Sequence, residues 1–379
     1  MSVNPICVTD LNFTQLEKMV QAMGETSYRA RQVQHWVYRR LALGFEEMTD
    51  LPQAFRQRLV RDLRLHNLTA LNELTGHDGT VKVLLALADG KTIESTLMRY
   101  RDNASKTRNT ICISTQVGCP IGCPFCATGQ QGFERNLTPG EIIGQVLYFA
   151  RYLRDRCGQE ENESKKPVNH ITNLVFMGMG EPLANYDSLW QAIEMLNSPR
   201  GFGLGARNMV VSTSGLVPQI ERLSQEKLQV GLAVSLHASD NALRDRLVPL
   251  NQRFPLEQVI SPCRRYVAAT GRRPSFEYAL FNGINDSLSQ ALSLVRLLKG
   301  LNCHVNLIPA NRTASQTFRP SPVSAILAFE GELKRRHIAC TLREPRGQDI
   351  DAGCGQLRSR YEQKARSKTF PAPAGGESR

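Results

Sequence analysis

The sequence lacks any apolar run of about 18 residues or more, and this absence excludes a transmembrane helix on length alone. Its first residues, MSVNPICVTDLN, also lack the basic segment followed by an apolar segment that marks a secretory signal. The two absences make the cytoplasm the expected compartment, with no membrane partner. In a reducing cytoplasm, the ten cysteines are not expected to form a framework of structural disulfides.

Acidic residues are scarce relative to basic ones: 35 Asp and Glu stand against 47 Lys and Arg, a formal net charge of +12 at pH 7. Such a balance favours polyanionic partners, nucleic acid first. Two basic segments, YRARQVQHWVYRR (28–40) and AFRQRLVRDLR (54–64), fall in a region of helical periodicity. Arginines interleaved with aromatic rings suit RNA, because they bind phosphates and stack on bases. We therefore predict a helical RNA-binding domain over residues 1–75; an ordinary amphipathic helix with solvated arginines fits equally well.

A β-hairpin is predicted next, over residues 80–98. Two apolar runs flank Asp89-Gly90, a dipeptide that favours the tight turn between antiparallel strands. The segment RYRDNASKTR (99–108) is predicted as a basic polar loop, so that residues 76–108 form a hairpin and a linker. The tail over residues 359–379 is basic and rich in Pro, Gly and Ser, which predicts disorder.

From residue 109 onward, strand patterns alternate with helical ones. Thr138-Pro139-Gly140-Glu141 opens one helix with a capping-box pattern and with proline at the first helical position. Repeated strand–helix units are typical of an α/β fold with a parallel sheet, open or closed into a barrel, whose site lies at the C-terminal ends of the strands. The predicted strands are 110–115, 173–178, 208–214, 230–237, 275–281 and 304–310.

Three cysteines, Cys119, Cys123 and Cys126, follow the first of these strands with the spacing CxxxCxxC. Thiolate sulfur suits zinc or an iron–sulfur cluster. A zinc site needs a fourth Cys or His ligand at short spacing, and the next cysteine is Cys157, in a polar connection. A four-iron cluster with three cysteine ligands keeps one iron open to a small molecule. The spacing therefore favours a cluster over zinc, and over three unrelated buried thiols.

The CxxxCxxC spacing resembles the signature of radical S-adenosylmethionine (SAM) enzymes. The likeness extends further, because several other motifs occur in the order found in the RlmN/Cfr family of RNA adenosine methyltransferases. With YRARQVQHWVYRR and FEEMTDLP, which resemble that family's N-terminal domain, the match spans roughly residues 12–358. The resemblance implies a partial (β/α)6 radical SAM barrel over residues 109–358, ending in a loop with a catalytic cysteine. The motifs are CISTQVGCPIGCPFCATGQQGFERNLTPGEIIGQV, FMGMGEPLANY, VVSTSGLVPQI, VSLHA, LIPANRT and RGQDIDAGCGQL.

The resemblance also implies the binding residues. The three clustered cysteines would hold one [4Fe–4S] cluster, and the amino and carboxylate groups of SAM would chelate its open iron. Taken singly, each residue implied to contact SAM is an ordinary turn or strand-end residue. The implied SAM contacts are Gly180, Glu181, Ser212, Ser235, Leu236, His237 and Asn311.

Two further cysteines complete the implied chemistry, although composition alone would make them buried small hydrophobic residues. Cys354 would accept a methyl group from one SAM. A radical from a second SAM would then remove a hydrogen atom from that methyl group, and the resulting carbon radical would add to an adenine. Cys112 would attack the sulfur of Cys354, which releases the methylated RNA and leaves a transient disulfide. Glu94 matches the glutamate that accepts the ring proton, although the segment from Glu94 to Cys112 is longer than in the family pattern.

The expected function follows from these implied roles. An aromatic C–H carbon is a poor nucleophile, so ordinary displacement on SAM cannot methylate it, whereas a radical can add to the ring. The enzyme would methylate C2 of adenosine in the peptidyl transferase centre of 23S rRNA and in the anticodon loop of tRNA. It would act as a monomer with an external, flavodoxin-like electron donor. The alternative is Cfr-like methylation of C8, which gives antibiotic resistance, and a more remote one is a non-catalytic RNA-binding protein stabilised by zinc.

Overall fold

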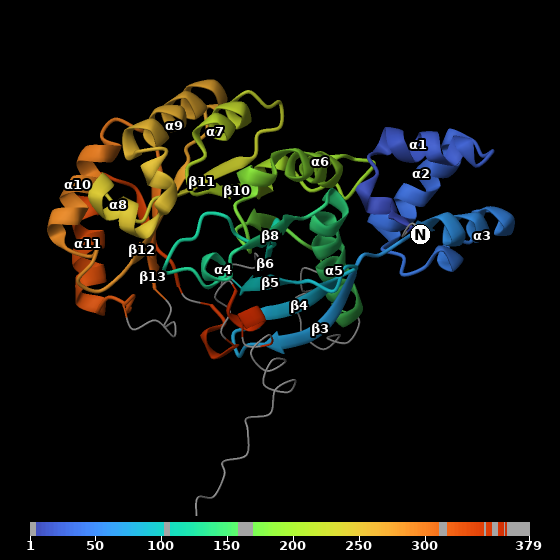
Figure 1. Ribbon diagram of the computed structural model, residues 1–379, viewed down its shortest axis with the longest axis horizontal. Coiled ribbons are helices and arrows are strands. Elements are labelled where there is room, and N and C mark those ends of the chain that lie inside the picture. Colours follow the sequence, from blue (N-terminus) through green and yellow to red (C-terminus); the bar gives the residue numbers. More distant parts are fainter. Residues whose placement is uncertain are drawn as a thin grey trace, which may run out of the picture.

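The computed structural model describes residues 5–101, 107–157, 170–310, 317–344, 346–350, 355–359 and 361. Figure 1 shows a lobe of N-terminal helices beside a curved sheet that carries helices on its outer side. The predicted disordered tail lies almost entirely outside the described residues. Within the described residues, no helix combines the length and the apolar content needed to cross a membrane. The N-terminal lobe contains α1 (Phe13–Ala22), α2 (Ser27–His35) and α3 (Gln53–Asp62).

A ten-stranded sheet organises the described part of the chain, in the order β14-β13-β12-β11-β10-β9-β6-β5-β4-β3. The strands from β6 to β14 pair in parallel, and β3 to β6 pair antiparallel. Because this order is linear, the barrel is partial, as the sequence predicts. The strands are β3 (Leu68–Thr75), β4 (Val81–Leu87), β5 (Thr92–Arg101), β6 (Thr107–Cys112), β9 (Asn173–Phe176), β10 (Met209–Thr213), β11 (Gly231–Ser235), β12 (Ser275–Leu280), β13 (His304–Pro309) and β14 (Cys340–Leu342).

Helices follow the parallel strands and cover the outer face of the sheet (Figure 1). Their apolar faces pack with the strands and the N-terminal helices into one continuous hydrophobic core. Two small sheets lie apart from the main one, β1 (Ile6–Cys7) with β2 (Leu63–Arg64), and β7 (Gln116–Gly118) with β8 (Phe133–Asn136). The main helices of the barrel are α5 (Pro139–Cys157), α6 (Tyr186–Asn197), α7 (Val217–Ser224), α8 (Asn241–Leu247), α9 (Leu256–Thr270), α10 (Leu288–Leu298) and α11 (Val323–Arg335).

The predicted parallel strands are all confirmed, and the predicted hairpin is β4 and β5 around a turn at Asp89-Gly90, with φ of 81° at Gly90. The predicted loop over residues 99–108 is wrong at both ends. Arg99 pairs with Asn109, and Tyr100 pairs with Arg108, so β5 and β6 continue into that segment. The polar composition of these residues suggested a loop, but an antiparallel partner satisfies their backbone groups.

The N-terminal lobe ends earlier than the predicted boundary at residue 75, because β3 belongs to the main sheet. β3 is an edge strand whose side chains are mostly exposed, so its sequence, LTALNELT, carries little apolar alternation. Trp36 is half-buried, and its indole N–H donates to Asp50 at 2.6 Å. Arg39 donates to two carbonyl oxygens of the barrel, whereas Arg31 is exposed. The first basic segment (28–40) therefore serves partly to join the lobes.

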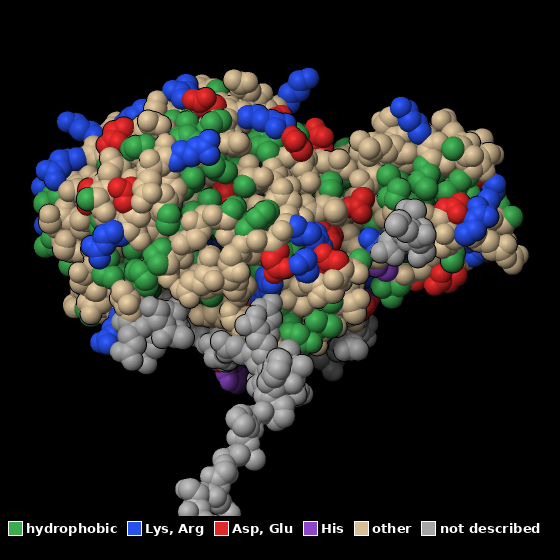
Figure 2. Space-filling model, in the orientation of Figure 1, with side chains coloured by type: hydrophobic (Ala, Val, Ile, Leu, Met, Phe, Trp, Pro, Cys, Tyr) green, Lys and Arg blue, Asp and Glu red, His purple; other side chains and the backbone are tan. Residues whose placement is uncertain are grey.

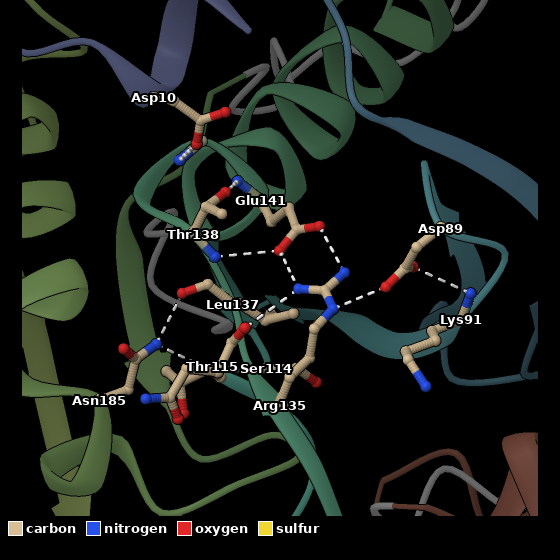
Figure 3. A network of polar contacts seen from close by, with 12 residues as sticks. Asp10, Asp89, Lys91, Ser114, Thr115, Arg135, Leu137, Thr138, Glu141 and Asn185 are labelled. Atoms are coloured by element: carbon tan, nitrogen blue, oxygen red, sulfur yellow. Dashed lines mark hydrogen bonds and ion pairs between the residues drawn. The ribbon is translucent and has the colours of Figure 1, made fainter. Parts of the chain in front are cut away.

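The predicted capping box at the start of α5 is confirmed (Figure 3). Glu141 accepts from the Thr138 N–H at 3.0 Å, and the Thr138 hydroxyl accepts from the Glu141 N–H at 3.2 Å. Arg135 binds Glu141 and also Asp89 of the β4–β5 turn, while Asp10 accepts from the N–H of Gly140 at 2.8 Å. The start of α5 thus connects the N-terminal segment, the hairpin and the barrel.

Candidate active site

A cavity of about 150 Å³ lies at the C-terminal ends of the parallel strands, where the fold predicts a ligand site. It collects side chains from the loop after β7 and from the ends of β9, β10 and β11. Leu236 is buried between two of the lining residues, and Asn311 lies outside the described residues. The other predicted cluster and SAM-binding residues all line this cavity: Cys119, Cys123, Cys126, Gly180, Glu181, Ser212, Ser235 and His237.

The backbone of a short loop positions the three thiols. Gly118 has φ of 76°, and a Cβ at this position would stand 1.8 Å from the carbonyl oxygen of Gly132. The same carbonyl accepts from the N–H of Cys119 at 2.9 Å, and the N–H of Cys126 donates to the carbonyl of Cys123 at 3.1 Å. Since only glycine permits so close an approach, the loop depends on Gly118.

The buried thiols need a cation in order to ionise. Burial, with Glu181 and Cys126 nearby, raises the pKa of the Cys119 thiol to about 12. Burial also raises the pKa of the Cys123 thiol, and the neighbouring thiols add to that rise. The three thiols line one cavity, and a four-iron cluster bonds each cysteine ligand to a different iron, so this donor set suits such a cluster.

Glu181 is a buried carboxylate held rigidly at the cavity wall. Its side chain accepts from the N–H of Ser214 at 2.7 Å and from the N–H of Leu183 at 3.2 Å. Burial raises the pKa of Glu181, and these hydrogen bonds oppose the rise. Gly180 precedes it with φ of 107°, and a Cβ there would lie 2.6 Å from the side chain of Gln116. Gly180 therefore permits a close approach within the protein, next to a carboxylate suited to an ammonium group.

His237 has φ of 59°, an unusual left-handed conformation for a non-glycine residue. Its Nδ1 accepts from the N–H of Ala279 at 3.0 Å, and its ring lies 5.0 Å from that of Phe125. Burial lowers the pKa of His237 to about 3, and Arg244 contributes to the shift. The imidazole is therefore neutral at ordinary pH, with its proton on Nε2. This state suits ligand binding and not proton transfer.

Cys112 and Glu94 lie on adjacent strands of the same sheet. Burial raises the pKa of the Cys112 thiol to about 11, while Arg343 and Lys82 oppose the rise and Glu94 adds to it. Glu94 is 3% exposed, and the ammonium group of Lys82 lies 2.8 Å from its carboxylate. Lys82 and Glu94 thus form a buried ion pair on β4 and β5, next to the strand that carries Cys112.

The chain that follows Cys354 is bound to Glu94. The N–H groups of Gly355 and Arg358 donate to its two carboxylate oxygens, at 2.8 Å and 2.6 Å. Cys354 itself lies outside the described residues, but its neighbour in sequence is thus fixed beside the strand that carries Cys112. The structure does not support a standing disulfide, because Cys112 is a free thiol.

Two charged residues at the site were not predicted from the sequence. Lys82 is the only charged residue in the strand sequence VKVLLAL, and it faces Glu94. A lysine within such an apolar run is a signal that could have been used, since lysine is seldom buried without a partner. Arg244 is fully buried on α8 behind the cavity. Its segment, NALRDRL, has the composition of an ordinary polar helix, so no local pattern marks it.

Comparisons with known proteins agree with this architecture. Residues 6–64 match the sequence profile described as "Ribosomal RNA large subunit methyltransferase N-terminal domain", and residues 113–295 match that of the radical SAM superfamily. A probable dual-specificity RNA methyltransferase RlmN of Moorella thermoacetica is 47% identical, over 91% of this chain and 94% of that protein. The corresponding protein of Chloroflexus aurantiacus is 45% identical, over 94% and 93% of the two chains.

A solved structure is also similar. The crystal structure of a radical SAM methyltransferase from Sphaerobacter thermophilus has a TM-score of 0.86 and 47% identity, covering 93% of this chain and 99% of that one. The superfamily implies a [4Fe–4S] cluster and SAM as cofactors. Relatives of this kind are enzymes, which rules out the non-catalytic zinc protein considered above. By its sequence and its fold, the chain belongs to the RlmN family of radical SAM RNA methyltransferases.

Proposed function

We propose that this enzyme methylates C2 of adenosine in 23S rRNA, at the peptidyl transferase centre, and in the anticodon loop of tRNA. The relatives named as dual-specificity RNA methyltransferases support two classes of RNA. The enzyme works as a monomer in the cytoplasm and takes electrons from an external, flavodoxin-like donor. The observation that carries the proposal is the hydrogen bond between Glu94 and Gly355, because it holds the residue after Cys354 beside β5, the strand that pairs with the one carrying Cys112.

Cys119, Cys123 and Cys126 hold the cluster in this proposal, and the polar strand-end residues hold SAM. When bound, the cluster and SAM supply the radical chemistry that an unactivated aromatic carbon requires. Glu181 accepts the ammonium group of SAM, since its carboxylate lines the cavity in a fixed orientation. Gly180, Ser212, Ser235, Leu236, His237 and Asn311 complete the SAM contacts.

Cys354 carries the methyl group, and Cys112 resolves the covalent adduct. Attack of the Cys112 thiolate on Sγ of Cys354 forms an S–S bond and breaks the bond between that sulfur and the transferred carbon, which leaves with the electron pair and takes up a proton to become the methyl group. Lys82 and Arg343 favour the thiolate that this attack needs, because both lower the pKa of Cys112 against the effect of burial. Glu94 accepts the ring proton, and for this one of its present hydrogen bonds must open.

Reconstitution in vitro tests the proposal. Purified protein, loaded anaerobically with iron and sulfide, is given SAM, a reductant and a fragment of 23S rRNA, and the digested RNA is analysed by mass spectrometry. We expect 2-methyladenosine from the wild type and none from Cys354→Ala. Cys112→Ala should leave RNA covalently attached to the protein through a bond that survives denaturation.

Three other outcomes would count against the proposal. Production of 8-methyladenosine would assign the enzyme to Cfr-like chemistry. Absence of any methylated adenosine from a cluster-loaded, SAM-binding protein would contradict the proposed substrate. Full activity of Cys112→Ala would contradict the role of the second cysteine.

A further inference from the structure

Arg244 is a fully buried cation that binds neutral oxygens only. It lies on α8 with 0% exposure, and among the described residues its hydrogen-bond acceptors are three backbone carbonyls and one side-chain amide oxygen. Transfer of an unpaired charge from water into a protein interior is costly, so buried arginines are almost always paired with acids. Burial lowers the pKa of Arg244 to about 10, which leaves the side chain positively charged at neutral pH.

The hydrogen bonds of Arg244 reach two sides of the cavity. Nη2 donates to the carbonyls of Ser214 at 2.7 Å and Ser235 at 3.2 Å, and Nε donates to the carbonyl of Leu236 at 3.1 Å. Nη1 donates to the side chain of Asn251 at 3.0 Å. Ser214 and Ser235 both line the cavity. One guanidinium thus connects the chain after β10 to the end of β11, at the wall of the candidate SAM site.

Arg244 lies close to the cysteine loop. Leu243 and Leu247, its neighbours on α8, pack in one apolar cluster with Cys123. Cys123 and Glu181 line the same cavity as the two serines whose carbonyls Arg244 binds. The cavity therefore gathers three thiols and a buried carboxylate, and Arg244 supplies positive charge next to them.

We propose that Arg244 is the counter-charge of the iron–sulfur centre and a positioning residue for its SAM-binding wall. The inference rests on the proposed function, because it requires a cluster held by Cys119, Cys123 and Cys126. One-electron reduction adds negative charge to a cluster already ligated by thiolates, and net charge is one determinant of cluster potential. A buried cation nearby stabilises the reduced form and raises the potential. The guanidinium is planar and carries several N–H donors in a fixed fork, so it can hold carbonyls on both sides of the cavity wall at once. The single ammonium group of a lysine cannot do this.

Four variants separate these effects. Arg244→Gln and Arg244→Met remove the charge, Arg244→Lys keeps the charge but loses the fork, and Arg246→Gln is the matched control on the exposed side of the same helix. The neutral variants are expected to fold, because among the described residues no buried carboxylate is left without its cation. The measurements are the midpoint potential of the reconstituted cluster, from a redox titration followed by electron paramagnetic resonance, and the Kd for SAM.

We expect both neutral variants to have more negative midpoint potentials than the wild type, and Arg244→Lys to stay close to the wild type. All three should bind SAM at least about tenfold more weakly, because none of them can reproduce the set of hydrogen bonds by which the guanidinium holds both sides of the wall. Arg246→Gln should change neither quantity. These readouts do not depend on turnover of RNA.

Unchanged potentials in both neutral variants would overturn the counter-charge role. If neither neutral variant folds, Arg244→Lys decides, and wild-type SAM affinity in that variant would overturn the proposal. Failure of the wild-type protein to assemble a cluster on its three cysteines would contradict the proposed function itself. That result is distinguishable, because it appears before any variant is compared.

Discussion

Glu94 is bound more firmly than the role of a proton acceptor requires. Its carboxylate binds the buried ammonium of Lys82 and two N–H groups of the C-terminal segment. Lys82 is 0% exposed and Glu94 is 3% exposed, so neither charge is solvated by water. A buried ion pair of this kind holds the C-terminal segment in place. Each of its charges is compensated by the other, so removing one leaves the other buried without a partner.

We therefore predict that Lys82→Met destabilises the protein by about 3–5 kcal/mol, because it leaves the carboxylate of Glu94 buried without its cation. Glu94→Leu should cost a similar amount for the converse reason. The double variant Lys82→Met/Glu94→Leu should be less destabilised than the sum of the two, since no lone charge remains. Urea unfolding of the wild type, the two single variants and the double variant measures the coupling energy between Lys82 and Glu94. If the two single effects add strictly, the prediction of coupling is contradicted.

The predictability of the site differs from residue to residue. Cys119, Cys123 and Cys126 are close together in sequence, so their spacing alone indicated a joint site. Glu181 and His237 were identified only through motifs at strand ends. Lys82 stands out as a charged residue within an apolar strand, whereas Arg244 lies in an ordinary polar helix whose sequence shows no sign of its burial.

At the scale of elements, the C-terminal segment is held on both sides of the residues that include Cys354. Before them, Asp78 of the β3–β4 turn accepts from the N–H of Gly347 at 3.0 Å, and the N–H of His77 donates to Asp349 at 2.9 Å. After them, Gln131 donates to the carbonyl of Gly355 at 3.1 Å. Turns and side chains of the barrel thus hold the described residues on both sides of Cys354.

We predict that Asp78→Ala frees this segment, because Asp78 binds both the Gly347 N–H and the Arg346 side chain. Trypsin should then cleave near Arg346 severalfold faster, and methylation of RNA should fall while the cluster remains. Asp89→Ala is the matched control, since Asp89 also binds an arginine from a hairpin turn but does not contact the segment. Equal cleavage rates in the two variants would contradict the prediction.

His66 connects the N-terminal lobe to α5. It contacts the carbonyl of Leu43 at 3.0 Å through Nε2, and Arg151 at 3.1 Å through Nδ1. Because arginine can only donate, Nδ1 must be the acceptor and the imidazole must be neutral. Burial lowers the pKa of His66 to about 4, and the positive charge of Arg151 contributes.

The resulting pH dependence has a definite sign. Between about pH 6.5 and pH 4 the unfolded chain binds a proton at His66 and the folded chain does not, so stability falls as the pH is lowered through this range. His66→Gln keeps a donor and an acceptor but cannot titrate. Urea midpoints at pH 7.5 and pH 5 should therefore differ less in His66→Gln than in the wild type. An identical difference in both proteins would exclude His66 as a contributor.

Strands and helices were more predictable than their boundaries. Several parallel strands, such as β9, β10 and β11, are short apolar runs that contain valine, and such runs are recognisable without tertiary information. The edge strand β3 and the ends of β5 and β6 are polar, and they become strands only because a partner is available. Their assignment depends on pairing between segments, which a single sequence does not show.

At the scale of the whole molecule, basic side chains lie on both lobes. On the face that Figure 2 shows, Lys and Arg are spread out rather than gathered in one patch. In the N-terminal lobe, however, arginines lie against exposed or half-buried rings. Arg31 is 5.8 Å from the ring centre of Tyr28, which is 56% exposed, and Arg40 is 5.9 Å from that of Trp36. Such pairs suit phosphates and unstacked bases.

We predict that Arg31→Ala/Arg40→Ala weakens RNA binding without affecting the cluster. The slope of log K against log salt should also become shallower by about 0.7 for each phosphate that the variant no longer binds. The control, Arg296→Ala/Arg335→Ala, removes equal charge from α10 and α11 at the opposite end of the molecule (Figure 1). These substitutions test RNA binding more specifically than deletion of the lobe does. Deletion would also disturb the barrel, because Arg39 and the shared core join the lobe to it. Equal weakening by both pairs would refute a localised RNA surface.

The most direct test of the whole account is mass spectrometry of digested rRNA and tRNA from cells with and without the gene for this protein. The account predicts that 2-methyladenosine disappears from both RNAs when the gene is absent. It should return with the wild-type gene and not with Cys354→Ala. Unchanged 2-methyladenosine, or loss of 8-methyladenosine in its place, would contradict the assignment.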